Sequence, residues 1–202
     1  MTFANNTFTI RFDFTMDGKD VKIQGLADPK TGTVPSVVLD GIVNGSVYAD
    51  GVKNATLQRD YNGYLVDDDV MISASGDVKI TNPIGGGVRE DLTVYAAQDV
   101  TVHANSGERY AVEGAANITC TGDVTLTNDS GAAVDYLLTI AGARDVTITG
   151  NVTIPNNKRL IDACRKHGIE VTYGRICSLK SDGTDRARVQ STFGWNNILV
   201  PI

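Results

Sequence analysis

Four aspartates recur through the middle of the chain at nearly constant spacing. They are Asp77, Asp99, Asp123 and Asp145, at intervals of 22, 24 and 22 residues. If the segments that carry them stack on one another, the four carboxylates form a column. Unit charges about 4.8 Å apart repel one another by roughly 1–3 kcal/mol per pair at a surface-like dielectric. Such a column therefore requires a partner for each carboxylate.

Three kinds of chemistry fit a column of carboxylates. Aspartate readily accepts backbone N–H groups in turns, and we expect each of these side chains to do so at its corner. A cation bound along the column is the first alternative. A catalytic acid pair is the second, and it is less favoured because an active site rarely repeats identically on every unit of a fold.

The other acidic and imidazole side chains lack the spacing of a site. Asp67-Asp68-Asp69 is the densest acidic run, but it does not have the alternating acidic pattern and distal glutamate of a calcium loop. We interpret it as a solvated loop. His103 takes the place of an outward threonine of the repeat, and we expect it and His167 to be structural or surface groups.

Thiol and phosphate-binding motifs are also missing from the sequence. Cys120, Cys164 and Cys177 have neither a C-x-x-C nor a Cys/His spacing, so we expect buried free thiols. Gly85-Gly86-Gly87 resembles a phosphate loop only superficially, because no Gly-Lys-Ser/Thr follows it. No G-x-S-x-G elbow occurs. We therefore predict a protein that is not an enzyme, with no catalytic, cofactor-binding or metal-binding residue and no cofactor.

Composition narrows the class of protein further. The chain has 202 residues, enough for one domain with a full core, and its 21 glycines are scattered at turn positions. The net charge is −6 and no basic cluster exists, which argues against a nucleic-acid partner. No 18-residue apolar stretch and no signal-peptide pattern occur, so we expect no membrane partner and synthesis in a cytoplasm.

The aspartates lie in a repeat of short alternating runs. Each is followed by a run such as Val100-Thr101-Val102 and preceded by another such as Leu92-Thr93-Val94. One period thus contains a strand, a tight corner, a second strand and a variable arc. A unit this short cannot bury its own apolar face, but stacked units can. A weaker copy spans residues 46–57. The expected core consists of Val100, Val102, Val124, Leu126, Val146 and Ile148.

A period of 22–24 residues predicts one turn of a parallel β-helix, since a propeller blade needs about 40–45 residues. We therefore expect an all-β, parallel β-helix solenoid of about five turns. It would carry an N-terminal hairpin or cap (1–26), the β-helix turns (27–154), and a C-terminal region with one short helix, a last strand and an apolar tail (155–202).

The two ends carry surplus apolar residues. Apolar residues alternate with polar ones on both sides of Asp17-Gly18, which predicts a β-hairpin there. A helix is expected over residues 158–167. We expect the apolar ends to form the interface of a homo-oligomer with closed symmetry, and we take a trimer as the expected order. The candidate interface residues are Phe8, Ile10, Phe12, Phe14, Phe193, Trp195 and Leu199.

Over residues 46–154 the repeats resemble those of right-handed parallel β-helix proteins. That group includes polysaccharide lyases, surface adhesins and virion proteins of tailed phages. The resemblance is architectural and carries no catalytic residues with it. It implies, as the first expectation, a non-enzymatic structural protein of a phage particle: a capsid decoration or cement protein or a tail-associated subunit, located in the virion and in contact with itself and with capsid or tail proteins. The alternative is an adhesin or carbohydrate-binding β-helix module at the extracellular surface.

Overall fold

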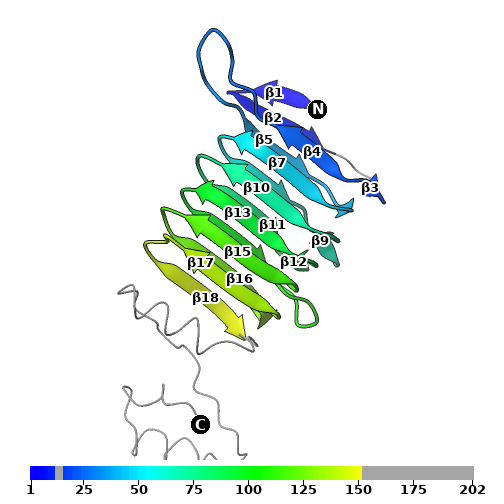
Figure 1. Cartoon of the computed structure of the whole chain (residues 1–202). Coiled ribbons are helices and arrows are strands. Elements are labelled where there is room, and N and C mark those ends of the chain that lie inside the picture. Colours follow the sequence, from blue (N-terminus) through cyan, green and yellow to red (C-terminus); the bar gives the residue numbers. More distant parts are fainter. Residues whose placement is uncertain (12–15, 152–202) are drawn as a thin grey trace, which may run out of the picture. The chain divides into compact units, whose positions relative to one another are not determined.

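The described part of the chain is a parallel β-solenoid. The computed structural model describes residues 1–11 and 16–151. Within them, successive turns of chain stack along one axis, and each strand pairs in parallel with the equivalent strand of the next turn (Figure 1). The predicted all-β fold is thus confirmed. The stack has about six turns, one more than the sequence indicated.

Three sheets run along the stack. The first contains β1 (Thr2–Ala4), β2 (Thr7–Arg11), β5 (Ser36–Asp40), β8 (Ala55–Gln58), β11 (Val78–Asn82), β14 (Val100–Ala104), β16 (Val124–Ala132) and β18 (Val146–Asn151). The second contains β4 (Val21–Gln24), β7 (Val47–Val52), β10 (Val70–Ala74), β13 (Leu92–Ala97), β15 (Ala115–Cys120) and β17 (Leu137–Ala141). The third contains β3 (Met16–Asp17), β6 (Val43–Asn44), β9 (Tyr64–Val66) and β12 (Gly86–Val88).

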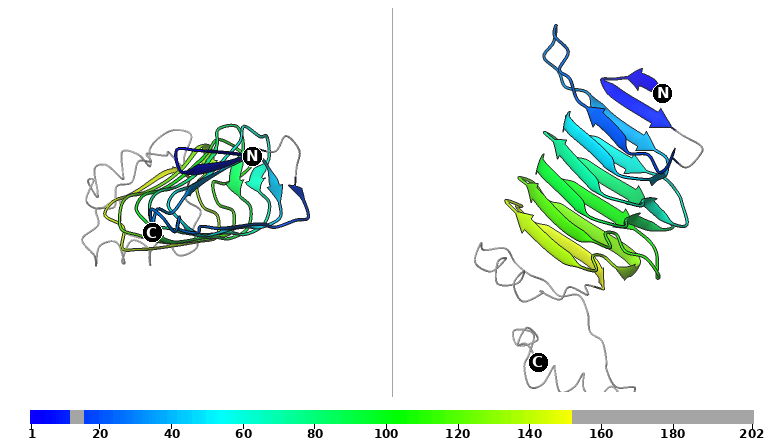
Figure 2. Two further views of the ribbon diagram at one scale, coloured as in Figure 1. Left: turned by 90° about the horizontal axis from the view of Figure 1, so that it is seen from above. Right: turned by 45° about the vertical axis from the view of Figure 1, so that its right-hand side comes forward.

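Most of the third sheet lies within the segments that the sequence presented as variable arcs, and β3 lies in the segment predicted as a hairpin. Its strands have only two or three residues, too few for alternation to reveal them. Single parallel bridges at Val112 and Val134 continue it through the later turns. Seen along the stack, the turns lie over one another around a common interior (Figure 2, left).

The core is a set of apolar ladders in which equivalent residues of successive turns pair with one another. Val100 pairs with Val78 of the previous turn and Val124 of the next, and Val102 pairs in the same way with Ile80 and Leu126. Because side chains alternate along a strand, these residues all face inward. The predicted Val100, Val102, Val124 and Leu126 are completely or almost completely buried. The predicted Val146 and Ile148 are half-buried, since they lie on β18, the last described strand.

The hairpin predicted around Asp17-Gly18 is wrong. The two alternating runs belong to different sheets: β2 pairs in parallel with β5, and β4 pairs in parallel with β7. Alternation cannot distinguish a hairpin from two sides of a solenoid turn, because both leave one face of each strand buried. The antiparallel hairpin lies one element earlier, between β1 and β2. It turns at Asn5-Asn6, both with positive φ, as a tight two-residue turn requires.

The predicted C-terminal helix and apolar tail lie outside the described residues, as do Cys164, His167 and Cys177. Among residues 1–11 and 16–151 no helix is long and apolar enough to cross a membrane.

Candidate functional site

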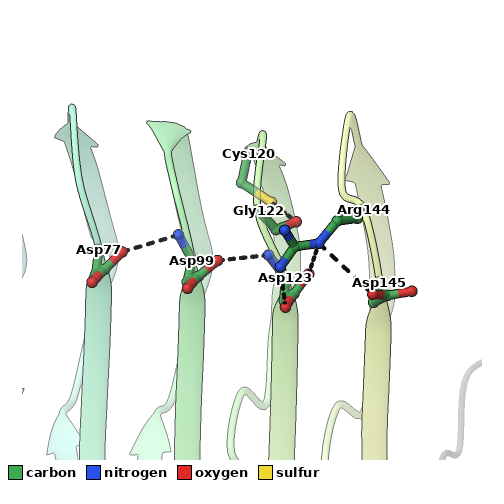
Figure 3. A network of polar contacts seen from close by, with 7 residues as sticks. All are labelled: Asp77, Asp99, Cys120, Gly122, Asp123, Arg144 and Asp145. Carbon is green, nitrogen blue, oxygen red and sulfur yellow. Dashed lines mark hydrogen bonds and ion pairs between the residues drawn. The ribbon is translucent and has the colours of Figure 1, made fainter.

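The repeated aspartates form a column at the corner that leads into the first sheet (Figure 3). The Asp77 carboxylate accepts the backbone N–H of Asp99 at 3.3 Å, and the Asp99 carboxylate accepts that of Asp123 at 2.8 Å. Asn54 begins the column by accepting the N–H of Asp77 at 2.9 Å. The expected acceptor role is therefore confirmed for Asp77 and Asp99, whereas Asp145 has an ion pair with Arg144 at 3.8 Å. The N–H group comes from the next turn, so each bond ties two turns together.

An arginine balances the last part of this column. Arg144 donates from Nε and Nη2 to the two carboxylate oxygens of Asp123, at 2.9 and 2.7 Å. These hydrogen bonds hold the pKa of the Asp123 carboxyl below its usual range, and the guanidinium charge and the N–H of Asp145 act in the same direction. The same pairing raises the pKa of Arg144. Both side chains remain partly open to water.

A second column stands at the corner that leads into the second sheet. Asp69 accepts the N–H of Asp91 at 3.2 Å, and Asp91 accepts the N–H of Ala115 at 2.7 Å. Asp20 accepts the N–H of Ser46 in the same way. The sequence did not reveal this column, because serine and alanine interrupt the run of aspartates. Together the two columns bind consecutive turns at two corners of the solenoid.

These bonds give the two columns a structural role. Each carboxylate named in the first column accepts a hydrogen bond from a backbone N–H group or pairs with a guanidinium group, as a capping residue does. Within the described ranges, no group of three or more histidine, cysteine, aspartate or glutamate side chains could hold a metal ion.

A different region combines aromatic and charged side chains in one concave surface. This tyrosine hollow has a volume of about 530 Å³ and lies over the arcs of the turns from β6 onward. It is lined by Asn44, Tyr61, Asn62, Gly63, Tyr64, Asp67, Arg89, Glu108, Arg109, Tyr110 and Glu113. The three tyrosines are up to 49 positions apart in the sequence, and the stacking of turns brings them together.

Hydrogen bonds between turns fix the shape of the tyrosine hollow. The Tyr64 hydroxyl accepts the backbone N–H of Tyr110 at 3.3 Å, 46 residues away. Arg109 donates from Nη1 to Asn62 Oδ1 at 3.3 Å, and Arg89 donates from Nη1 to Asp67 Oδ1 at 3.1 Å. Burial, together with the hydrogen bond to Glu113, raises the pKa of Tyr64 far above its usual range. The phenol therefore stays protonated and can donate to the Glu113 carboxylate.

Glycines make room for the tyrosine rings. A Cβ at Gly86 would lie 2.5 Å from ring carbons of Tyr64 and 3.0 Å from Cβ of Arg109. A Cβ at Gly63 would collide with the ring of Tyr61. Gly86 belongs to the Gly85-Gly86-Gly87 run. This part of the run thus serves packing: Tyr64 can lie across the next turn and reach Tyr110 in the turn beyond.

Two buried asparagines fix the arcs that carry the tyrosine hollow. Asn82 accepts the N–H of Tyr61 at 3.0 Å and donates to the carbonyls of Gly63 and Gly86 at 3.0 and 2.8 Å. Asn128 donates to the carbonyls of Arg109 and Ala132 and accepts the N–H of Ser106 at 2.9 Å. Both side chains are fully buried, so these bonds replace water. In the sequence both are simply polar residues at the ends of strands.

A second hollow, of about 500 Å³, lies outside the first sheet and is lined by Arg11, Asp40, Gln58, Arg59, Asp60, Thr81 and Pro83. Asp40 forms ion pairs with Arg11 at 3.0 Å and with Arg59 at 3.3 Å. Among the described residues that line this hollow, none is aromatic.

The remaining predicted residues are distributed over the surface and the core. His103 faces outward on β14 as expected, and its Nε2 lies 2.9 Å from Asp129 Oδ2. In the acidic run, Asp68 is exposed, but Asp67 and Asp69 have the partners given above. Cys120 is a buried free thiol, and burial raises its pKa.

The interface candidates fall into two groups. Phe8 is 38% exposed and its ring packs against that of Phe3, with centroids 4.4 Å apart and the ring planes tilted by 38°, whereas Ile10 is half-buried against the core. The structure does not describe Phe12, Phe14, Phe193, Trp195 and Leu199.

The fold defines the class: the chain is a parallel β-solenoid. Comparison with family models, with curated proteins and with solved structures finds no match.

Proposed function

We propose that the chain is a non-enzymatic structural protein of a phage particle, a capsid decoration or tail-associated subunit that associates with itself. The observation that carries this proposal is the apolar N-terminal edge of the first sheet. Met1 is 86% exposed, Phe3 is 57% exposed, and Phe3 stacks on Phe8. Phe3 lies on β1 and Phe8 on β2, Met1 directly precedes β1, and β1 is the outermost strand of the sheet. An open strand edge with exposed aromatic residues favours association with another chain.

The ties between turns support the same proposal. The two aspartate columns and the two buried asparagines join consecutive turns by hydrogen bonds in addition to the sheet ladders. A solenoid reinforced in this way resists bending and local opening, because each turn is held at its corners as well as along its strands. Such rigidity suits a subunit that stands on a particle surface.

Sedimentation of the purified full chain tests the association. We expect a homo-oligomer, with a trimer as the specific prediction, and we expect the double variant Phe3→Ser/Phe8→Ser to sediment as a monomer. Leu26→Ser is the matched control, because Leu26 is 71% exposed on the loop after β4 and lies outside this edge. A wild-type monomer at micromolar concentration, with residues 1–26 and 189–202 both protected from protease, would contradict the proposal.

The second candidate is an adhesin or carbohydrate-binding module at an extracellular surface. One specific observation favours it: Tyr61, Tyr64 and Tyr110 line one hollow although they are scattered in the sequence. Aromatic faces beside hydrogen-bonding side chains are the usual equipment of a small-molecule binding site.

A further inference from the structure

We propose that the tyrosine hollow binds an uncharged saccharide. This inference rests on the second candidate function and names the ligand class and the residues of its site. It is independent of the proposed self-association, which rests on the apolar edge at β1 and not on the tyrosine hollow.

The lining of the tyrosine hollow includes aromatic surface. Tyr61 is 37% exposed, and its ring lies against Gly63, where no side chain competes for the space. Tyr64 lies against Gly86 in the same manner. The exposed Tyr61 ring offers a flat apolar face with a polar hydroxyl at one end, and the half-buried Tyr64 and Tyr110 lie beside it in the lining. A sugar ring presents the matching surface, with C–H groups on its faces and hydroxyls around its rim.

The charges of the hollow decide between neutral and charged ligands. Its lining holds two arginines and three carboxylates, Asp67, Glu108 and Glu113. Arg89 is already paired with Asp67, and Arg109 bonds to the amide oxygen of Asn62. The balance is thus slightly negative, which opposes an anionic ligand. A cationic ligand would be repelled by the two guanidinium groups.

Hydroxyl groups fit this lining because they both donate and accept. Guanidinium N–H groups donate, and carboxylate and amide oxygens accept, so adjacent sugar hydroxyls find both kinds of partner. Hydrogen bonds to charged groups are also the stronger ones. A ligand with only donors or only acceptors would leave one set without a partner.

The hollow is also held ready for a ligand. Its tyrosines stand on arcs anchored by the buried Asn82 and Asn128, and Tyr64 is fixed to Tyr110 by a bond between turns. A site that is already ordered loses little conformational entropy on binding, so a modest set of contacts suffices. The structure therefore favours a defined ligand pose over loose surface adhesion.

The test uses the full chain on an array of neutral, uronic-acid-containing, sialylated and amino-sugar oligosaccharides, followed by calorimetric titration of the strongest ligand. We expect a neutral oligosaccharide to bind, and we expect Tyr61→Ala and Arg109→Ala each to weaken it at least tenfold. Tyr95→Ala is the matched control, because Tyr95 is 50% exposed on β13 and lies outside the hollow. Its affinity should equal that of the wild type.

Three results would overturn the inference: no oligosaccharide bound by the wild type, binding of charged oligosaccharides only, or unchanged affinity in Tyr61→Ala. Circular dichroism of each variant confirms that the fold is intact. Because Tyr61 and Arg109 lie outside the β1 edge, sedimentation of the same samples tests self-association separately. Failure of one proposal is therefore distinguishable from failure of the other.

Discussion

Substitution of Asp99 separates the two properties of a column carboxylate, its acceptor oxygen and its charge. Asp99 Oδ1 accepts the Asp123 N–H at 2.8 Å, and the residue is exposed. A hydrogen bond contributes about 0.5–1.5 kcal/mol net, and a charged acceptor contributes more. Since water can replace the lost acceptor in part, Asp99→Ala should lower the free energy of unfolding by about 1 kcal/mol.

Asp99→Asn should have a much smaller effect. Asparagine keeps an acceptor oxygen, and the loss of the charge relieves repulsion from Asp77 above and Asp123 below. We therefore expect its free energy of unfolding to stay within about 0.5 kcal/mol of the wild type, a surface-like effect. The difference in free energy of unfolding between Asp99→Ala and Asp99→Asn measures the contribution of the hydrogen bond between turns, separately from that of the charge.

Urea unfolding followed by circular dichroism measures both variants. For a fold of this length, about 1 kcal/mol corresponds to a melting temperature lower by about 2–4 °C. Asp68→Ala is the control, because Asp68 is an exposed aspartate between β9 and β10. Two results would refute this expectation. If Asp99→Asn loses as much stability as Asp99→Ala, the charge and not the acceptor oxygen is what stabilises the corner. If a chelator lowers the melting temperature of the wild type, the carboxylates hold a cation.

Three further predictions follow from the core, the ion pair and the thiol. Val124→Asp should prevent folding, because an unpaired buried charge costs several kcal/mol, whereas Thr125→Asp on the outward face should stay soluble and folded. Pairing with Arg144 depresses the pKa of Asp123, so this pair stabilises the fold at neutral pH. The stabilisation is lost as the pH falls through the folded-state pKa. The difference in free energy of unfolding between the wild type and Arg144→Gln should therefore shrink on acidification. Cys120 is buried with a raised pKa, so peptide mapping should find it alkylated by iodoacetamide only in urea.

The solenoid could be predicted because its signal repeats. A single Val-Thr-Val run is ambiguous, but the same run after each of four evenly spaced aspartates requires stacked turns. The register follows too, since inward residues such as Val100 and Val124 must align for the core to close. The prediction for the first turn is wrong for a physical reason: the alternation around Asp17-Gly18 fits a hairpin and a solenoid turn equally well.

The tyrosine hollow could not be predicted, because nothing in the sequence relates its members. Tyr64 and Tyr110 meet only because the turns have particular lengths and the intervening Gly86 lacks a side chain. The arcs that carry them vary in length and have no periodic pattern. Asn82 and Asn128 are the one signal in the sequence that could have indicated the anchored arcs. Each is a polar residue at an inward position of a strand whose other inward positions are apolar.

The central claim is that equivalent residues of successive turns lie side by side in parallel register, and cysteine cross-linking tests it most directly. Thr101 and Thr125 are register partners on β14 and β16 and face outward. With the native cysteines replaced by serine, Thr101→Cys/Thr125→Cys should form a disulfide under mild oxidation, because adjacent strands lie about 4.8 Å apart. Thr101→Cys/Thr127→Cys, displaced by two residues along the strand, should remain largely reduced. Equal or reversed yields in the two pairs would contradict the register and, with it, the juxtaposition that forms the tyrosine hollow.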